Sequence, residues 1–188
     1  MFYFKVFLFV LWVILATGCS TPIAEYKDAS PKLALNEFFQ GRLEAYGMVQ
    51  NYKGKVTRRF KAEIIGNWEG DTGILDERFV YDNGEIQYRC WHLQKSDNQY
   101  TGTASDVVGH ATGETQGNAL NWRYILQVPV KGKLRNIRLN DWLYLIDEKH
   151  LINRATMTYF GIPVGEITLS INKVDELDTT PLSKSCSL

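Results

Sequence analysis

Polar and aromatic side chains occur together inside segments that are otherwise apolar, and these residues could bind a ligand. The polar members are Glu77, Arg89, Asn121 and Arg154, and the aromatic members are Trp91, Trp122, Tyr124, Trp142 and Tyr144. If the segments are strands of a barrel, inward positions of this kind line a space that fits either packed side chains or one small ligand. Two interpretations follow: a binding cavity, or a filled barrel that contains a buried ion pair.

The sequence offers little for catalysis or for metal binding. The three histidines are scattered and have no ligand partner at a useful spacing; they are His92, His110 and His150. The fragments S-D-N at 96–98 and S-x-x-K at 170–173 occur in the reverse of the order found in penicillin-recognising enzymes, and K-T-G is absent. We therefore expect no catalytic residue, no metal and no cofactor. Glu77 is the single candidate for the acid or base of an unrecognised activity.

Short β-rich runs recur at regular spacing from Arg42 onward. They lie at about 42–50, 54–65, 73–81, 85–95, 99–108, 119–129, 134–147, 151–160 and 164–173. No helical stretch between them is long enough for a crossover, so the strands should pair antiparallel. We interpret the glycines at 109, 113 and 117 as turns and bulges. The pattern predicts an all-β protein with an antiparallel barrel of eight to ten strands.

A short helix is predicted before the first strand. Ser30 could cap its first amides, Pro31 suits the first helical position and Gly41 could end it. The apolar residues within it, Leu35, Phe38 and Phe39, recur at helical spacing. We expect the helix, residues 31–40, to plug one end of the barrel.

The Asn83-Gly84 pair marks a tight hairpin whose register decides the neighbours of Glu77. A loop of three residues, 82–84, places Glu77 opposite Arg89, whereas a loop of two residues places it opposite Cys90. We favour the three-residue loop because it pairs two charges that would otherwise lie alone on apolar strands.

The first residues have the layout of an export signal, with Lys5 followed by an apolar run from Val6 to Ala16. The run is too short to span a membrane, which needs ~20 apolar residues. Residues 16–19, Ala-Thr-Gly-Cys, resemble the lipobox of bacterial lipoproteins, although Ala16 replaces the usual leucine. The resemblance implies a signal peptide at 1–18, lipid on Cys19 and, because Ser20 is not aspartate, the periplasmic face of the outer membrane. An ordinary secretory signal is the alternative.

The rest of the chain is expected to divide into a tether at 19–30, a barrel domain at 31–173 and a loose tail at 174–188. The chain has 21 basic and 21 acidic residues, so its net charge favours no nucleic acid partner. Cys90 and Cys186 could pair in an oxidising compartment. We favour two free thiols, because Cys186 lies near the chain end and Cys90 suits packing as a small apolar residue.

A series of short motifs resembles a known family. The motifs are Phe38-Phe39-x-Gly41, Gly66-x-Trp68-x-Gly70, Glu77-x-Phe79-x-Tyr81-Asp82-x-Gly84, Arg89-x-Trp91, Gly117-Asn118-Ala119, Asp141-Trp142-x-Tyr144 and Phe160-Gly161. Together they resemble the proteobacterial lipoproteins grouped as domain of unknown function 3833, which implies an envelope location and no established activity. The order of helix and strands is also similar to lipocalins, although Leu43 stands where their G-x-W motif has tryptophan.

These observations favour a lipocalin-like, membrane-anchored protein that binds a small apolar or amphipathic ligand. Arg89 and Glu77 would orient a polar head group, while aromatic side chains line the cavity. The predicted ligand-binding set is Glu77, Arg89, Trp91, Trp122, Tyr124, Trp142 and Arg154. The alternative is a non-catalytic accessory lipoprotein with a filled barrel that docks a partner protein in the envelope.

Overall fold

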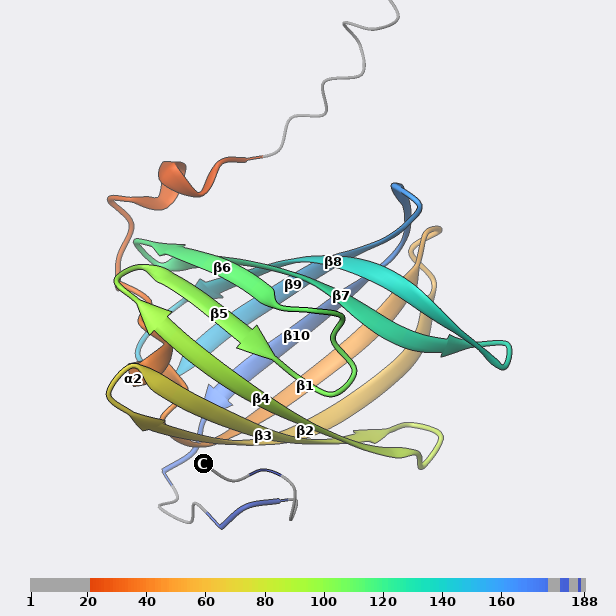
Figure 1. The fold of residues 1–188 in the computed structure, drawn as a ribbon, viewed down its shortest axis with the longest axis horizontal. Coiled ribbons are helices and arrows are strands. Elements are labelled where there is room, and N and C mark those ends of the chain that lie inside the picture. The colour runs from red at the N-terminus through yellow and green to blue at the C-terminus, as the bar shows by residue number, and fades with distance from the viewer. Residues whose placement is uncertain (1–20, 176–179, 183–185, 187–188) are drawn as a thin grey trace, which may run out of the picture.

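Ten antiparallel strands form one sheet that closes on itself, with β1 paired to β10 (Figure 1). This computed structural model describes residues 21–175, 180–182 and 186; the predicted signal peptide and Cys19 lie outside them. The strands are β1 (Gly41–Asn51), β2 (Val56–Glu69), β3 (Thr72–Tyr81), β4 (Ile86–Ser96), β5 (Gln99–Thr103), β6 (Ala111–Gln116), β7 (Ala119–Val130), β8 (Lys133–Leu145), β9 (His150–Tyr159) and β10 (Ile162–Lys173). The predicted all-β barrel of eight to ten strands is confirmed.

The loop that joins β3 to β4 has three residues, 82–84, between the hydrogen-bonded residues Tyr81 and Glu85. The Tyr81 amide donates a hydrogen bond to the Glu85 carbonyl at 2.9 Å, and Gly84 adopts a positive φ of 82° within the loop. Glu77 consequently lies opposite Arg89. The register that we predicted from the hairpin is confirmed.

The segment between β4 and β7 differs from the prediction. The strand expected at 99–108 ends at Thr103, and residues 111–116, expected as turns and bulges, form β6. Gly109 and Gly117 have positive φ and lie in turns, as predicted, whereas Gly113 pairs with Trp122 inside the sheet. A Cβ at Gly113 would overlap the indole of Trp122, so the glycine is needed for packing within a strand rather than for a turn.

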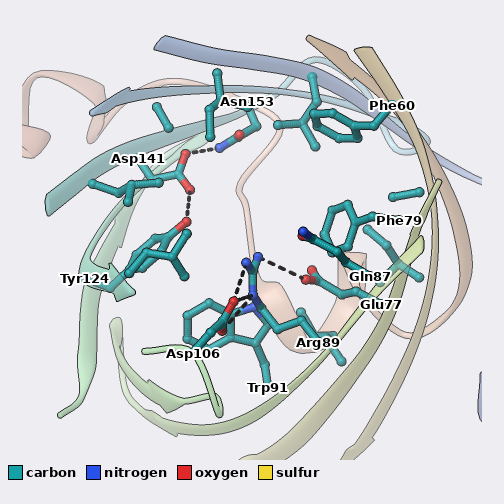
Figure 2. A pocket seen from close by; sticks show the side chains of 18 of the residues that line it. Phe60, Glu77, Phe79, Gln87, Arg89, Trp91, Asp106, Tyr124, Asp141 and Asn153 are labelled. Atoms are coloured by element: carbon teal, nitrogen blue, oxygen red, sulfur yellow. Dashed lines mark hydrogen bonds and ion pairs between the residues drawn. The ribbon is translucent and has the colours of Figure 1, made fainter. Parts of the chain in front are cut away.

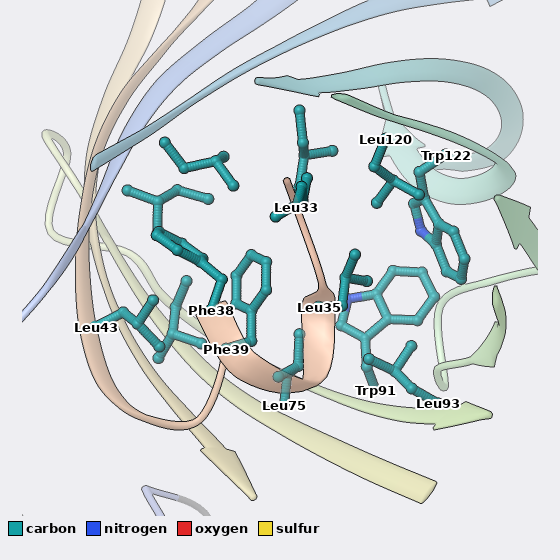
Figure 3. Close-up of a cluster of buried hydrophobic side chains, with 14 of the residues drawn as sticks. Leu33, Leu35, Phe38, Phe39, Leu43, Leu75, Trp91, Leu93, Leu120 and Trp122 are labelled. Carbon is teal, nitrogen blue, oxygen red and sulfur yellow. The ribbon is translucent and has the colours of Figure 1, made fainter. Parts of the chain in front are cut away.

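A short helix, α2 (Leu35–Phe38), closes one end of the barrel (Figures 1 and 3). Its apolar side chains and Phe39 pack among inward residues of the strands, including Leu43, Leu75 and Trp91. Gly66 of β2 permits this close approach, because a Cβ there would overlap the Phe39 carbonyl oxygen. The plug is thus confirmed.

The helix is shorter than the 31–40 segment that we predicted, and it begins after Ala34 rather than at Pro31. Residues 31–34 are not helical: Ala34 has an extended backbone, and the Leu33 amide donates a 2.8 Å hydrogen bond to the Gly117 carbonyl in the β6–β7 turn. In the described part of the chain, no helix has the length and apolar composition needed to cross a membrane.

The predicted tether begins outside the described residues, but its described part, residues 21–30, includes a 3-10 helix, η1 (Ile23–Tyr26). This helix contacts β6 and β7. Tyr26 packs against the rings of Trp142 and Tyr144, with centroids 5.6 Å apart in each case. The segment therefore covers part of the outer surface near the closed end of the barrel.

Cys90 of β4 forms a disulfide with Cys186, which is buried against the outer face of the sheet. The expectation of two free thiols is wrong, and so is the interpretation of 174–188 as a loose tail where it concerns Cys186. The physical reason is that the outer face of β3 is buried beside Cys90, at Ile74 and Asp76, so a segment of the chain must pack over the sheet at this point. Most of the tail lies outside the described residues.

Breaking the disulfide should destabilise the barrel, because the bond closes a loop with a sequence separation of 96 residues. We expect Cys186→Ser to lower the free energy of unfolding by about 3 kcal/mol. Urea unfolding of residues 21–188, which contain every strand and both cysteines, would measure the change. Cys90→Ser is the matched control and should have the same effect, with no further loss in the double variant. A Cys186→Ser protein as stable as the parent would contradict the assignment.

Candidate functional site

The barrel encloses a cavity of about 670 Å³. Leu35 and Phe39, at the helix α2 end, form its floor, and Glu85 and Pro129, in or beside the β3–β4 and β7–β8 turns, lie at its other end. Side chains alternate between the two faces of a strand, so the lining residues are spaced two apart, as with Leu75, Glu77 and Phe79 on β3 and Leu139, Asp141 and Leu143 on β8. Its volume falls within the ~300–1,000 Å³ typical of small-molecule pockets.

Five of the seven residues that we predicted for ligand binding line the cavity. They are Glu77, Arg89, Trp91, Trp122 and Tyr124. The three aromatic rings form one wall, with Trp91 in edge-to-face contact with Trp122 at 5.8 Å and with Tyr124 at 5.4 Å. Phe60 and Phe79 line another part of the cavity, with ring centroids 5.8 Å apart.

Trp142 and Arg154 do not belong to the site, and their assignment to it is wrong. They lie opposite each other on β8 and β9, on the outer face of the barrel. Trp142 stacks on Tyr144, and Arg154, with 62 % of its side chain exposed, pairs with Glu166 at 3.0 Å. The register places Asp141, not Trp142, opposite the inward Trp122, so strand alternation directs Trp142 outward.

Arg89 is the centre of the polar part of the cavity (Figure 2). Its Nε and Nη2 donate to the two carboxylate oxygens of Asp106 at 3.0 and 2.8 Å, and its Nη1 lies 3.7 Å from Glu77 Oε2. Asp106 is therefore the stronger partner, although the sequence pointed only to Glu77. No local signal could have identified it, because Asp106 lies in the β5–β6 loop and enters the barrel from there.

The loop that carries Asp106 is fixed to β7. The Gln127 amide donates to the Asp106 carbonyl at 2.8 Å, and the Val108 amide donates to the Ile125 carbonyl at 2.9 Å. Strands β5 and β6 are short, and beyond their ends these bonds attach the β5–β6 loop to β7 in place of a further strand. The position of the Asp106 carboxylate is thus set by the backbone of a neighbouring strand.

A second polar group faces Arg89 from across the cavity (Figure 2). Asn153 Nδ2 donates to Asp141 Oδ1, and the Tyr124 hydroxyl donates to Asp141 Oδ2 at 3.5 Å. Sequence reasoning missed Asp141 and Asn153. A signal for Asp141 was present, because it alternates with apolar residues at 139, 143 and 145 on one face of β8.

Burial changes the acidity of these groups. It raises the pKa of Glu77 to about 7, although the Arg89 charge acts in the opposite direction, and it raises the pKa of Asp141 to about 6 against the hydrogen bonds from Asn153 and Tyr124. Burial also raises the pKa of Tyr124 well above its usual range. For Arg89, burial acts to lower the pKa, but the hydrogen bonds to Asp106 and the Glu77 charge raise it overall.

The cavity has more acidic than basic groups. Its charged lining residues are Arg58, Glu77, Glu85, Arg89, Asp106 and Asp141. Arg58 pairs with Glu85 at 2.7 Å, and Arg89 is shared between Asp106, which it binds at 2.8 Å, and Glu77, which lies 3.7 Å away. The two cations of the lining are therefore both engaged, and Asp141 forms no ion pair with a described residue. Glu77 Oε2 accepts no hydrogen bond from the described residues, although it is buried. Such an acceptor favours a ligand that donates.

Among the described residues, no group of three histidine, cysteine or acidic side chains is placed to hold a metal ion. The arrangement instead offers an apolar chamber with hydrogen-bond acceptors on two sides. Such a chamber can bind and orient a molecule, and the raised pKa values allow Glu77 and Asp141 to exchange protons near neutral pH.

The closed antiparallel barrel with its internal cavity defines a lipocalin-like barrel protein. Residues 13–173 match the model of a family described as "protein of unknown function (DUF3833)", and the chain belongs to this family. The resemblance that the motifs suggested is therefore confirmed. No curated protein matches the sequence significantly.

Several solved structures match this fold, including the following two. An S-type phycobiliprotein lyase, CPES, from Guillardia theta is 9 % identical, with a TM-score of 0.57 over 77 % of this chain and 94 % of that chain. A protein of the DUF3598 family from Nostoc punctiforme is 12 % identical, with a TM-score of 0.56 over 83 % of this chain. The present chain spans about half of the latter, covering 53 % of it. At such low identity the likeness concerns the fold alone.

The raised pKa of Glu77 predicts a pH-dependent contribution to stability. Because the folded protein binds this proton more tightly than the unfolded chain does, the stabilisation is present at low pH and is lost as pH rises through about 7. Between pH 8 and pH 5, the free energy of unfolding of the parent protein should rise by roughly 2 kcal/mol more than that of Glu77→Gln. Urea unfolding at both pH values measures it.

The matched control is Glu166→Gln on the outer face. Its free energy of unfolding should change between pH 8 and pH 5 by the same amount as that of the parent protein. The Glu77→Gln protein should still fold, since Arg89 keeps its bidentate partner Asp106. Parent and Glu77→Gln curves that stay parallel from pH 5 to pH 8 would contradict the assigned environment of Glu77.

Proposed function

We propose that the barrel binds one small amphipathic molecule, with the apolar part against the aromatic walls and a hydrogen-bond-donating head group between Glu77 and Asp141. The observation that carries this proposal is the cavity of about 670 Å³, which contains a buried polar cluster in an otherwise apolar chamber. The alternative, an accessory protein with a filled barrel, requires a solid interior. The cavity favours the binding function.

The charged residues that line the cavity indicate which charge the head group of the ligand carries. An anionic head would need a free cation, but Arg89 is bound by Asp106 and Arg58 by Glu85. Glu77 and Asp141 offer acceptor oxygens on opposite sides of the cavity (Figure 2). A protonated amine would meet both the carboxylates and the faces of aromatic rings, which also attract cations. A cationic amphiphile is therefore the ligand class that this interior fits best.

Binding should follow the ionisation of Glu77. We expect the described barrel, produced as residues 21–188, to bind n-decylamine at least tenfold more tightly than n-decanoate at pH 8, a difference of about 1.4 kcal/mol. Quenching of the cavity tryptophans, Trp91 and Trp122, would report binding. Affinity for the amine should fall as pH decreases from 8 to 6, because Glu77 gains a proton around pH 7.

Glu77→Gln should remove most of this pH dependence and weaken binding of the amine, whereas Glu166→Gln on the outer face should leave binding unchanged. Equal affinity for amine and carboxylate would contradict the head-group assignment. Failure to bind either probe, together with a bare polypeptide mass in native mass spectrometry of protein from its native envelope, would move the assignment to the partner-docking alternative.

We also propose that the protein is a lipoprotein, anchored through Cys19 at the periplasmic face of the outer membrane. The signal layout of residues 1–18 supports this proposal. The disulfide between Cys90 and Cys186 adds support, because such bonds persist in oxidising compartments such as the periplasm. Cys19 is the one cysteine of the chain that this pairing leaves over.

Replacement of Cys19 tests the anchor directly. We expect Cys19→Ala to abolish incorporation of labelled palmitate and to remove the protein from the outer-membrane fraction, because the acylated thiol is lost. Cys186→Ser serves as the cysteine control and should keep the label. Palmitate incorporation that survives in Cys19→Ala would refute the assignment, as would a parent protein found free in the periplasm.

A further inference from the structure

Four hairpin turns, β1–β2, β3–β4, β7–β8 and β9–β10, lie at the end of the barrel opposite helix α2 (Figure 1), and exposed apolar side chains lie on or beside each of them. We call this set the rim, and it consists of Tyr52, Ile86, Val130, Leu134, Phe160 and Ile162. Phe160 is 87 % exposed and Leu134 is 65 % exposed, and it is the gathering of such side chains at one end, rather than any one of them, that indicates an interaction surface. The rim lies around the end of the cavity marked by Glu85 and Pro129.

Unpaired basic residues lie among the rim residues. Lys53 and Lys55 are exposed in the β1–β2 turn, and Lys131 and Lys133 are exposed at the β7–β8 turn. None of the four forms an ion pair with a described residue, whereas the acidic residues of the β3–β4 turn, Asp82 and Glu85, are paired with Arg59 and Arg58. This end of the barrel is therefore both apolar and positively charged.

The turns at the opposite end carry more acidic than basic residues. Glu69 ends β2 and Asp71 follows it, Asp97 lies between β4 and β5, and Asp147 and Glu148 lie with a single basic residue, Lys149, between β8 and β9. The chain as a whole has no net charge, so the basic rim results from a separation of charge along the barrel. The amino-terminal η1 also packs near the closed end, on β6 and β7, and leaves the rim uncovered.

We propose that the rim docks on an anionic membrane surface, with the tips of the hairpins inserted among the lipid head groups and the cavity mouth facing the lipid. Exposed Phe, Leu and Ile side chains on separate turns, interspersed with lysines, match the apolar interior and the negative charge of such a surface. A bound amphiphile could then pass between lipid and cavity without crossing water. The membrane that the rim contacts need not be the one that would hold lipid on Cys19.

Vesicle binding by residues 21–188, which lack Cys19, separates docking by the rim from anchoring. We expect sedimentation with vesicles that contain about a third phosphatidylglycerol, at least tenfold weaker binding to phosphatidylcholine alone, and release at about 0.5 M salt, where charges are screened beyond roughly 4 Å. The assay contains no added ligand, so failure of the proposed binding function would not affect its outcome.

Two pairs of substitutions test the two parts of the rim. Leu134→Ser with Phe160→Asn removes apolar tips, and asparagine suits the positive φ of 48° at position 160. Lys131→Asn with Lys133→Gln removes two charges. Each pair should weaken vesicle binding about tenfold or more. Ile146→Ser, 55 % exposed at the other end, and Lys27→Gln with Lys32→Gln are matched controls that should bind normally.

Loss of binding confined to the rim variants would support the proposal. No binding to anionic vesicles, equal binding to neutral vesicles, or equal loss in the control variants would overturn it. Sedimentation velocity over a range of concentrations tests whether the rim binds a second copy of this chain instead. Self-association that the rim substitutions abolish, without vesicle binding, would overturn the membrane proposal and assign the rim to a second copy.

Discussion

The pairing of β1 with β10 is the interaction on which the rest of the structure depends, because it turns an open sheet into a barrel with an inside. Residues 43–51 of β1 pair continuously with β10, so the sheet has no exposed edge there. Closure divides every strand into an inner and an outer face. It thereby decides which polar side chains share a cavity and which meet solvent or the amino-terminal segment.

Inside the barrel, the burial of Arg89 determines the chemistry of the site. A guanidinium removed from water needs matched partners, and Asp106 supplies two hydrogen bonds from a loop that the β7 backbone holds in place. Because Asp106 satisfies this need, the nearby Glu77 is not fully compensated and its pKa rises with burial. The site consequently presents acceptors rather than a free cation, although the sequence shows an arginine at its centre.

The two ends of the barrel have different physical roles. Helix α2 and its apolar neighbours close one end, with Phe38 and Phe39 in edge-to-face contact at 5.2 Å (Figure 3). The hairpin turns at the other end carry apolar and basic residues. A cavity with one sealed end and one amphipathic mouth has a defined direction of entry, which suits a molecule that partitions between lipid and protein.

The sequence by itself determined the strands and turns that depend on local chemistry. Alternation and turn residues placed nine of the ten strands. The Asn83-Gly84 turn left two registers open, and the opposite charges of Glu77 and Arg89 indicated the correct one. Only the tertiary structure decided which residues from distant strands meet: Asp106 with Arg89, Asp141 with Asn153, and Cys90 with Cys186. The tertiary structure also directed Trp142 outward. There the ring of Tyr26 covers it, and for this reason an outer residue looked like a core residue in the sequence. Alternation along a strand shows that two faces exist, but the register between strands and the segments packed outside them determine which face is the interior.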